Sequence, residues 1–330
     1  MNLYLNFLWR FSIKAGASIL GSRNKLWHLQ GANKGRGALP SNPGEIDKRR
    51  LVTRCTFTTG CQVHCSARNL HMDDFEETDI SHAILEAYHG KFDKALQSDV
   101  VLVGAGPSGL VAAWRLARAN LRVVILEKRL SPGGGIWGGS LGMNEVVVQK
   151  QALGILKEAG VRYGPHGLLF TADATELASA LCLKALHAGA TLLNLMTAED
   201  LCVHEECVKG VVANRSMLGE NLPIDPIVFS ARAVVDATGH EAFLVNCLLR
   251  RGLMKDKPTR IPGEGPMDAY SGERFVEDSV AELYPGLWVT GMSVCASMGG
   301  PRMGPIFGGM LLSGSKAAAL IALSLKGKWD

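Results

Sequence analysis

The chain has 330 residues, of which 47% are hydrophobic and 20% are charged, and these values describe an ordinary globular protein rather than a disordered one. Its formal net charge of +4 is small, and no basic stripe interleaved with aromatic residues is present, so we do not expect nucleic acid as a partner. No apolar run approaches the roughly 20 residues needed to span a bilayer, so we expect no membrane partner either.

The first 75 residues differ from the rest in composition. The first 44 contain six Lys or Arg residues and no Asp or Glu, and no sustained periodicity follows up to residue 75. An organelle transit peptide has this composition, and a segment translated from a wrongly assigned start codon would look the same. We therefore predict a disordered or transit-like leader over 1–75 and a single domain over 76–330. We expect a cytoplasmic protein, or an organellar one if the leader directs import.

The eight cysteines form no recognisable metal-binding pattern. Cys55, Cys61 and Cys65 lie near His64, but their spacing matches no common zinc site. We interpret these three as thiols of the leader. The other five are interpreted as reduced packing residues: Cys182, Cys202, Cys207, Cys247 and Cys295.

The domain begins with alternating helix and strand patterns. Apolar spacing predicts a helix over 79–96, capped by Thr78 or Asp79, and the apolar run 99–104 predicts a buried parallel strand. A helix over 108–119 and a strand over 122–126 complete a βαβ unit. Farther along, the patterns predict helices over 149–158, 174–187 and 305–325, with Pro305 in the first turn of the last. They also predict strands over 191–195, 201–203, 208–213, 233–237 and 287–290. The strands over 201–203 and 208–213 can pair as a hairpin. This order predicts an α/β, Rossmann-like fold of the two-dinucleotide-binding flavoprotein type, with a parallel central sheet and a smaller antiparallel layer.

A glycine motif connects the first predicted strand to the helix that follows it. Gly104, Gly106 and Gly109 form G-x-G-x-x-G, in which the first glycine permits a tight turn, the second lets backbone approach a pyrophosphate and the third lets helix and strand pack closely. Glu127 ends the next strand, eighteen residues past Gly109, where an acid can bind the hydroxyls of a ribose. An acid there also disfavours a 2′-phosphate, so NAD or FAD is expected rather than NADP.

Two later strands also end in glycine, at Gly239 and Gly291, as is typical of two-dinucleotide-binding flavoproteins. An acidic residue commonly follows the second of these glycines in flavoproteins, and here the residue is Met292. This difference argues against bound flavin, although an FAD-dependent oxidoreductase stays open as an alternative on the fold signals alone.

Three segments are more distinctive than the nucleotide motif. They are SPGGGIWGG at 131–139, MNEVVVQ at 143–149 and RMGPIFGGM at 302–310, and together they resemble the thiamine thiazole synthase family. The resemblance, from about 79 to 325, implies an enzyme of the pentosyltransferase class. Such an enzyme makes adenosine diphosphate-5-(β-ethyl)-4-methylthiazole-2-carboxylate from NAD, glycine and sulfide for thiamine biosynthesis, and releases nicotinamide. A homo-oligomer, an octamer with sites shared between chains, is also implied.

The resemblance further implies roles for individual residues. Asp225 and His240 would bind ferrous iron across a subunit boundary, and the planar guanidinium of Arg302 would hold the carboxylate of glycine. Without the resemblance, Asp225 is a turn residue and His240 a loop or helix-capping residue, because two ligands are too few to identify a metal site. The residues implied as nucleotide contacts are Gly104, Gly106, Ser108, Gly109, Glu127, Lys128, Gly135, Ala198, Pro223, Ile224, Asp225 and Met292.

One position departs from the family pattern. Many eukaryotic members carry a cysteine two residues before the metal-binding aspartate and sacrifice its sulfur, and many archaeal members carry a histidine there. This chain has Pro223, which has neither sulfur nor a donor group. Either sulfide supplies the sulfur with iron as its carrier, or the chain has lost thiazole synthesis and is a non-catalytic NAD-binding protein. We favour sulfide, because the other matched residues are intact; a sugar-phosphate isomerase of related sequence is a weaker alternative.

Overall fold

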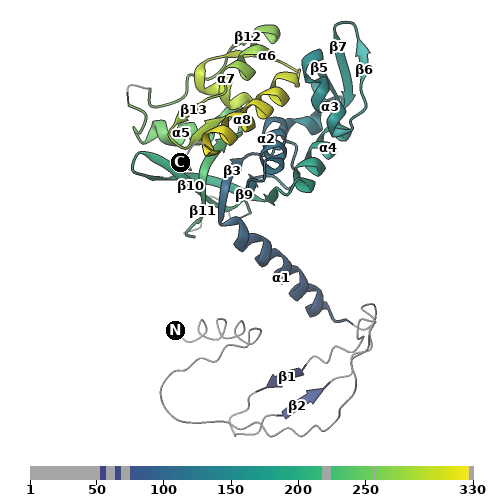
Figure 1. The fold of residues 1–330 in the computed structure, drawn as a ribbon, viewed down its shortest axis with the longest axis vertical. Helices are drawn as coiled ribbons and strands as arrows, with labels where there is room; N and C mark the ends of the chain where they lie inside the picture. The colour runs from purple at the N-terminus through teal and green to yellow at the C-terminus, as the bar shows by residue number, and fades with distance from the viewer. Residues whose placement is uncertain (1–52, 57–63, 68–74, 218–223, 256–257, 327–330) are drawn as a thin grey trace. The chain divides into compact units, whose positions relative to one another are not determined.

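The computed structural model describes residues 53–56, 64–67, 75–217, 224–255 and 258–326 (Figure 1). The chain divides into two compact units, Met1–Asp74 and Phe75–Asp330. In the first unit, strands β1 (Thr53–Thr56) and β2 (His64–Ala67) pair antiparallel. These strands are described by their backbone alone, and Cys61 lies outside the described residues. The leader character of 1–75 stays a prediction.

The second unit is built on an eight-stranded sheet. Its main path runs in the order β13-β14-β11-β3-β4-β8, in which the strands from β14 to β8 are parallel and β13 pairs antiparallel at the edge. The strands of this path are β13 (Glu282–Tyr284), β14 (Leu287–Val289), β11 (Ile227–Asp236), β3 (Gln97–Val103), β4 (Val123–Glu127) and β8 (Thr191–Asn194). Every residue of β4 is buried, as expected of a parallel strand covered on both faces. The predicted α/β fold with a parallel sheet is confirmed.

An antiparallel extension adjoins one strand of this sheet. Strands β9 (Met196–His204) and β10 (Cys207–Arg215) form the predicted hairpin, and β10 pairs with the first part of β11, where Ala213 lies opposite Ile227. The second part of β11 pairs in parallel with β3. Because β11 belongs to both layers, it begins six residues before the predicted strand over 233–237.

Helices cover the sheet (Figure 1). The first is α1 (Glu77–Ala95), whose N-cap is Glu76 rather than the predicted Thr78 or Asp79; Asp79 instead accepts a hydrogen bond from the Glu76 N–H at 2.9 Å. The predicted helix over 149–158 is a 3₁₀ turn, η3 (Lys150–Ala152), followed by α3 (Leu153–Ala159). The remaining α-helices are α2 (Pro107–Arg118), α4 (Ala174–His187), α5 (Phe243–Arg250), α6 (Ala269–Asp278), α7 (Met292–Met298) and α8 (Gly308–Lys326).

Helix α8 packs beside α2 in the interior of the unit (Figure 1). A side chain at Gly314 would lie 2.3 Å from the carbonyl oxygen of Ser108, so the two helices approach closely through small residues. Among the described helices, α8 has the length and mean hydropathy of a membrane span, although Ser313, Ser315 and Lys316 interrupt its apolar run. Half of its apolar window is buried inside the protein, which is the behaviour of a core helix.

The start of α8 also differs from the prediction. The helix begins at Gly308, and Pro305 precedes it instead of occupying its first turn. The carbonyl oxygen of Pro305 accepts a hydrogen bond from the Ser140 hydroxyl at 2.6 Å, which ties it to the glycine-rich segment rather than to the helix.

Several short elements had no prediction. A separate antiparallel sheet has the order β5-β7-β6, and a two-stranded parallel ladder joins β12 to β15. These strands are β5 (Glu145–Gln149), β6 (Gly164–His166), β7 (Leu169–Asp173), β12 (Gly265–Met267) and β15 (Pro301–Arg302). Three further 3₁₀ turns are η1 (Gly134–Gly138), η2 (Ser140–Gly142) and η4 (Gly239–Glu241).

Candidate functional site

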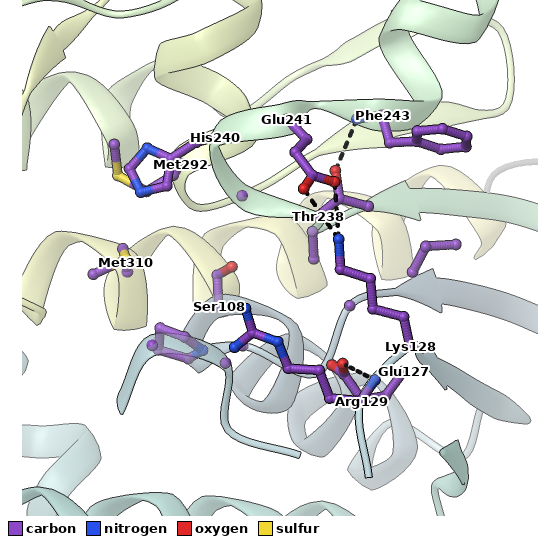
Figure 2. Close-up of a pocket in the computed structure, with 18 of the residues that line it drawn as sticks. Ser108, Glu127, Lys128, Arg129, Thr238, His240, Glu241, Phe243, Met292 and Met310 are labelled. Atoms are coloured by element: carbon purple, nitrogen blue, oxygen red, sulfur yellow. Dashed lines mark hydrogen bonds and ion pairs between the residues drawn. The ribbon is translucent and has the colours of Figure 1, made fainter. Parts of the chain in front are cut away.

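A cavity of about 770 Å³ opens where the parallel strands β3, β4, β11 and β14 end (Figure 2). Cavities of this size hold cofactors and drug-sized ligands, and ligands of open α/β sheets bind at the carboxyl ends of the strands. The lining includes Gly104, Gly106, Ser108, Glu127, Lys128, Arg129, Gly134, Gly135, Ala198, His240, Glu241, Phe243, Met267, Met292, Arg302 and Met310.

The glycine motif forms one wall of the cavity, and each of its glycines has a distinct reason to lack a side chain. Gly104 has a φ of +101°, and a Cβ there would meet the Ala237 carbonyl oxygen at 2.4 Å. A Cβ at Gly109 would lie 2.2 Å from the Gly104 carbonyl oxygen, so Gly109 supports the turn from behind and does not line the cavity. Gly106 caps α2 and has open space beside its Cα, which leaves room for a ligand at the helix N-terminus.

Glu127 holds the turn as well as lining the cavity. Its side chain is 5% exposed, and its two oxygens accept hydrogen bonds from the Ala105 and Arg129 N–H groups, both at 2.8 Å. These bonds fix the carboxylate beside the glycine motif. Each carboxylate oxygen can accept a second hydrogen bond, so the group keeps capacity for a ribose hydroxyl.

Two cations follow Glu127 and differ in their partners. The Lys128 ammonium lies 3.0 Å from both carboxylate oxygens of Glu241, and this ion pair joins the end of β4 to η4 (Figure 2). The guanidinium of Arg129 makes no ion pair or hydrogen bond with the described residues, and Figure 2 shows it reaching through the cavity toward Ser108. Arg129 is therefore the cation in this cavity without a carboxylate partner in the described part of the chain.

A buried carboxylate organises the loop that carries His240. Asp236 is fully buried, and burial raises the pKa of its carboxyl group. It accepts hydrogen bonds from the Thr238 N–H (3.0 Å), the Thr238 hydroxyl (2.7 Å), the Leu244 N–H (2.8 Å), the Val245 N–H (3.2 Å) and the Ser293 hydroxyl (3.0 Å). These bonds tie the loop to the first turns of α5 and α7. They position His240 and Glu241 at the cavity.

A second carboxylate connects the two residues assigned to chemistry. The Nδ1 of His240 lies in contact with Oε1 of Glu264, and the Nε of Arg302 lies 4.0 Å from Oε2 of the same residue. The Glu264 side chain is 13% exposed, whereas those of His240 and Arg302 are 63% and 59% exposed and line the cavity. Glu264 therefore lies behind His240 and Arg302.

Other sequence-predicted residues lie elsewhere. Ile224 and Asp225 are exposed and are not part of the cavity lining of this chain, and Pro223 lies outside the described residues. In the described ranges, no group of three or more His, Cys, Asp or Glu side chains could hold a metal ion. A single chain thus brings His240 and Arg302 to the cavity but does not bring Asp225 there.

The sequence interpretation missed several lining residues. Arg129 and Glu241 directly follow predicted site residues, and that adjacency was a usable signal. Phe243 and Met310 contribute apolar surface to the cavity and carry no pattern of their own (Figure 2). Glu264 had no signal, because only the folded chain brings its loop to His240.

The thiols of the described domain lie outside the cavity. None of the cavity-lining residues is a cysteine. Burial, together with the nearby carboxylate of Glu264, raises the pKa of the Cys295 thiol to about 11, and burial also raises the pKa of Cys182 and of Cys247. These groups behave as the reduced packing residues that were predicted, and the five cysteines between residues 75 and 326 are free within the described part of the chain.

Comparison with known proteins gives a consistent result. The profile of the Thi4 family matches residues 81–307. The thiamine thiazole synthase of Thermococcus kodakarensis is 50% identical over 251 residues, which cover 76% of this chain and 98% of that protein. The thiamine thiazole synthase of Thermotoga maritima is 46% identical over 248 residues, which cover 75% of this chain and 97% of that protein. The crystal structure of Thermovibrio ammonificans THI4 has 43% identity and a TM-score of 0.74, and covers 77% of this chain and 100% of that one.

Proposed function

This chain belongs to the Thi4 family, and from that premise we propose that it makes the thiazole of thiamine from NAD, glycine and sulfide, with release of nicotinamide. The product is adenosine diphosphate-5-(β-ethyl)-4-methylthiazole-2-carboxylate. One observation carries the proposal: a single cavity has a nucleotide-binding loop at one wall and a histidine and an arginine, held by a shared carboxylate, at another.

The nucleotide binds along the glycine motif. The open space at Gly106 and the free N–H groups at the start of α2 accommodate the diphosphate, which the partial positive charge of the helix N-terminus favours. Glu127 accepts a hydrogen bond from the adenosine ribose, and the unpartnered guanidinium of Arg129 supplies a counter-charge for the diphosphate. Ala198 and Met292 add apolar contacts.

Glycine binds at the opposite wall. Arg302 lines the cavity, and the two parallel N–H groups of its guanidinium can hold a carboxylate there. Water replaces nicotinamide at the anomeric carbon and the ribose ring then opens to a carbonyl, with which the amine of glycine condenses as water is lost. Holding the two reactants in one cavity turns their condensation into an effectively intramolecular step.

The donor set fits half of a ferrous iron site within one chain. An ionised carboxylate can only accept hydrogen bonds, so the Nδ1–H of His240 donates to Glu264 and its Nε2 keeps a free lone pair for a metal. Asp225, exposed and outside this cavity lining, would complete the site from a neighbouring copy of the chain. Iron held there would supply a binding position for sulfide.

Two features support an external source of sulfur. The residue two positions before Asp225 is Pro223, which carries no sulfur. No cysteine lines the cavity among the residues that the structure describes. A chain that consumes free sulfide can act repeatedly, whereas a chain that sacrifices a cysteine acts once.

The wider organisation that we propose follows from the same assignment. Residues 1–75 are a leader outside the catalytic domain, which spans 76–330. The protein acts as a homo-oligomer, an octamer, in the cytoplasm or in the organelle to which the leader directs it. Because each site would take Asp225 from a neighbouring copy of the chain, activity would require the oligomer.

The proposal is tested anaerobically with purified protein, ferrous iron, NAD, glycine and sulfide, and with mass spectrometry of the adenylated product. We expect more than one product molecule per chain, and no product when sulfide is omitted. The variants His240→Ala and Arg302→Gln should lose product and keep NAD binding. Arg274→Gln, which changes an exposed arginine on α6 away from the cavity, is the matched control and should keep both.

Absence of product with NAD bound and unbroken would refute synthesis and favour a non-catalytic NAD-binding protein. A yellow chromophore that copurifies with the protein and resists exchange by NAD would instead favour the flavoprotein alternative.

A further inference from the structure

Glu264 contacts both residues that the proposed reaction uses at the far wall of the cavity. Its Oε1 meets the Nδ1 of His240, and its Oε2 lies 4.0 Å from the Nε of Arg302. The two partners are 24 and 38 residues away in the sequence, one before and one after Glu264. A single carboxylate therefore lies between a candidate metal ligand and a candidate carboxylate-binding group.

The backbone around Glu264 is held on both sides. The Gly263 N–H donates to the Ala296 carbonyl at 3.1 Å, and the Gly265 N–H donates to the Gly300 carbonyl at 2.8 Å. The strands β12 and β15 then pair in parallel, which places the loop of Glu264 next to the strand that ends at Arg302. A carboxylate anchored in this way can orient side chains that are themselves half-exposed.

We propose that Glu264 is a positioning residue that fixes the ring of His240 for metal binding and the guanidinium of Arg302 for the carboxylate of the amino-acid substrate. The inference rests on the proposed function, because it takes the metal and glycine roles of these two residues from it. Glu264 itself touches neither substrate nor metal.

The first half of this role concerns the imidazole. By accepting a hydrogen bond from Nδ1–H, Glu264 selects the tautomer whose Nε2 lone pair is free, and it limits rotation of a side chain that is 63% exposed. Outer carboxylates of this kind typically change metal affinity by about 10- to 100-fold when they are replaced.

The second half concerns the guanidinium. Arg302 is 59% exposed and has no other ion pair with the described residues, so its long side chain would otherwise sample many rotamers. An oxygen of Glu264 facing Nε leaves the two terminal nitrogens for a bidentate contact with a substrate carboxylate. The shared carboxylate thereby holds the iron ligand and the glycine-binding group in one geometry.

The experiment compares wild type with Glu264→Gln and Glu264→Ala in the full-length oligomer. Anaerobic titration with Co(II), followed by its d–d absorption, measures metal affinity without turnover. Steady-state assays give the KM for glycine and kcat separately, and calorimetry gives the Kd for NAD. Glu206→Gln, which changes an exposed glutamate in the β9–β10 turn, is the matched control.

We expect Glu264→Gln to weaken Co(II) binding about 10-fold and to raise the KM for glycine several-fold, while the Kd for NAD stays at the wild-type value. Glu264→Ala should weaken both further, and the control should change neither. If Glu264→Ala fails to fold, the isosteric Gln variant still gives all three measurements.

The inference would be overturned if Glu264→Gln kept the Co(II) affinity and the KM for glycine of the wild-type protein. So would a parallel loss of NAD affinity, because that result would mean general damage to the cavity rather than positioning of His240 and Arg302. Failure of the proposed function would give a different result. In that case, the wild-type protein would lack a Co(II) absorption band that depends on His240, and His240→Ala would leave its spectrum unchanged.

Discussion

Glu273 on α6 makes the stability of the domain depend on pH. Its side chain is 6% exposed, Oε2 accepts the Gly309 N–H at 2.8 Å, and Oε1 is buried without a hydrogen-bond partner in the described part of the chain. Burial, opposed by the Gly309 bond and assisted by the charge of Glu277, raises the pKa of Glu273 from 4.5 to about 7. The folded chain therefore prefers the protonated carboxyl group.

The sign of the effect follows from proton binding. Between pH 4.5 and about 7 the folded state holds a proton at Glu273 that the unfolded state has lost. The contribution of this proton to the free energy of unfolding is therefore fully present below pH 4.5 and is lost as pH rises through 7. Each unit of difference between the two pKa values corresponds to about 1.4 kcal/mol, so the full titration changes the free energy of unfolding by about 3 kcal/mol. For a domain of this size, that is a fall of roughly 5–10 °C in Tm.

The variant Glu273→Gln keeps the shape of the side chain and removes its ionisable group. Urea denaturation at pH 5 and pH 8 should show wild type losing about 2.5 kcal/mol more than the variant between the two values. Glu277→Gln, on the same helix, should retain most of the wild-type pH dependence. An identical pH dependence in wild type and Glu273→Gln would show that the buried carboxyl group does not titrate as the structure implies.

Three further predictions concern the cavity and its supports. Arg129→Gln should weaken NAD binding about 10-fold and leave adenosine binding unchanged, as measured by calorimetry, because only NAD carries the diphosphate. Equal losses for both ligands would contradict the counter-charge assignment. Gly109→Ala should destabilise the domain by about 3 kcal/mol or more and abolish NAD binding, since its Cβ would lie 2.2 Å from a backbone oxygen that cannot move aside; a wild-type melting curve would contradict this. Asp236→Asn should cost about 2–4 kcal/mol in urea, because one side of the amide presents donors to N–H groups. A loss below about 1 kcal/mol would count against this network.

The sequence predicted the parts of the fold whose signals are local. The strand–glycine–helix–strand unit from β3 to β4 was predicted because its apolar runs, glycine spacing and terminal acid all lie in one short stretch of chain, 97–127. Helix α4 was predicted with both its ends, since Asp173 caps it by accepting the Glu176 N–H and its apolar positions are periodic. The antiparallel hairpin was also predicted, from its two apolar runs.

Elements that depend on distant contacts were missed. Helix α6 contains Gly272, which weakens its helical pattern, yet glycine is required there because a Cβ would lie 2.9 Å from the Pro301 carbonyl oxygen. Strands β12 and β15 have three and two residues, too few to produce a periodic signal. The ladder that they form is nevertheless what brings Glu264 near Arg302.

The candidate site divides in the same way. The glycine motif and Glu127 of its nucleotide half lie in one continuous segment, so their sequence pattern was enough to predict them. Its reaction half combines His240 of η4, Glu264 of a loop and Arg302 of β15. The family resemblance identified only the two of these residues that would touch iron or substrate. Glu264 becomes visible only in the folded chain, because a supporting carboxylate has no motif of its own.

The placement of the thiols bears on how often one chain can act. The sulfur of a thiazole comes either from a protein thiol or from a sulfide carried to the site. A donor thiol must reach the cavity and ionise, yet Cys295 and Cys247 are buried with raised pKa values, and Cys182, Cys202 and Cys207 lie outside the lining. Within the described domain, no cysteine meets both conditions. The position two residues before the candidate iron ligand holds proline. The placement of the described thiols and this proline both support the proposal that sulfide from solution supplies the sulfur, which would permit repeated turnover.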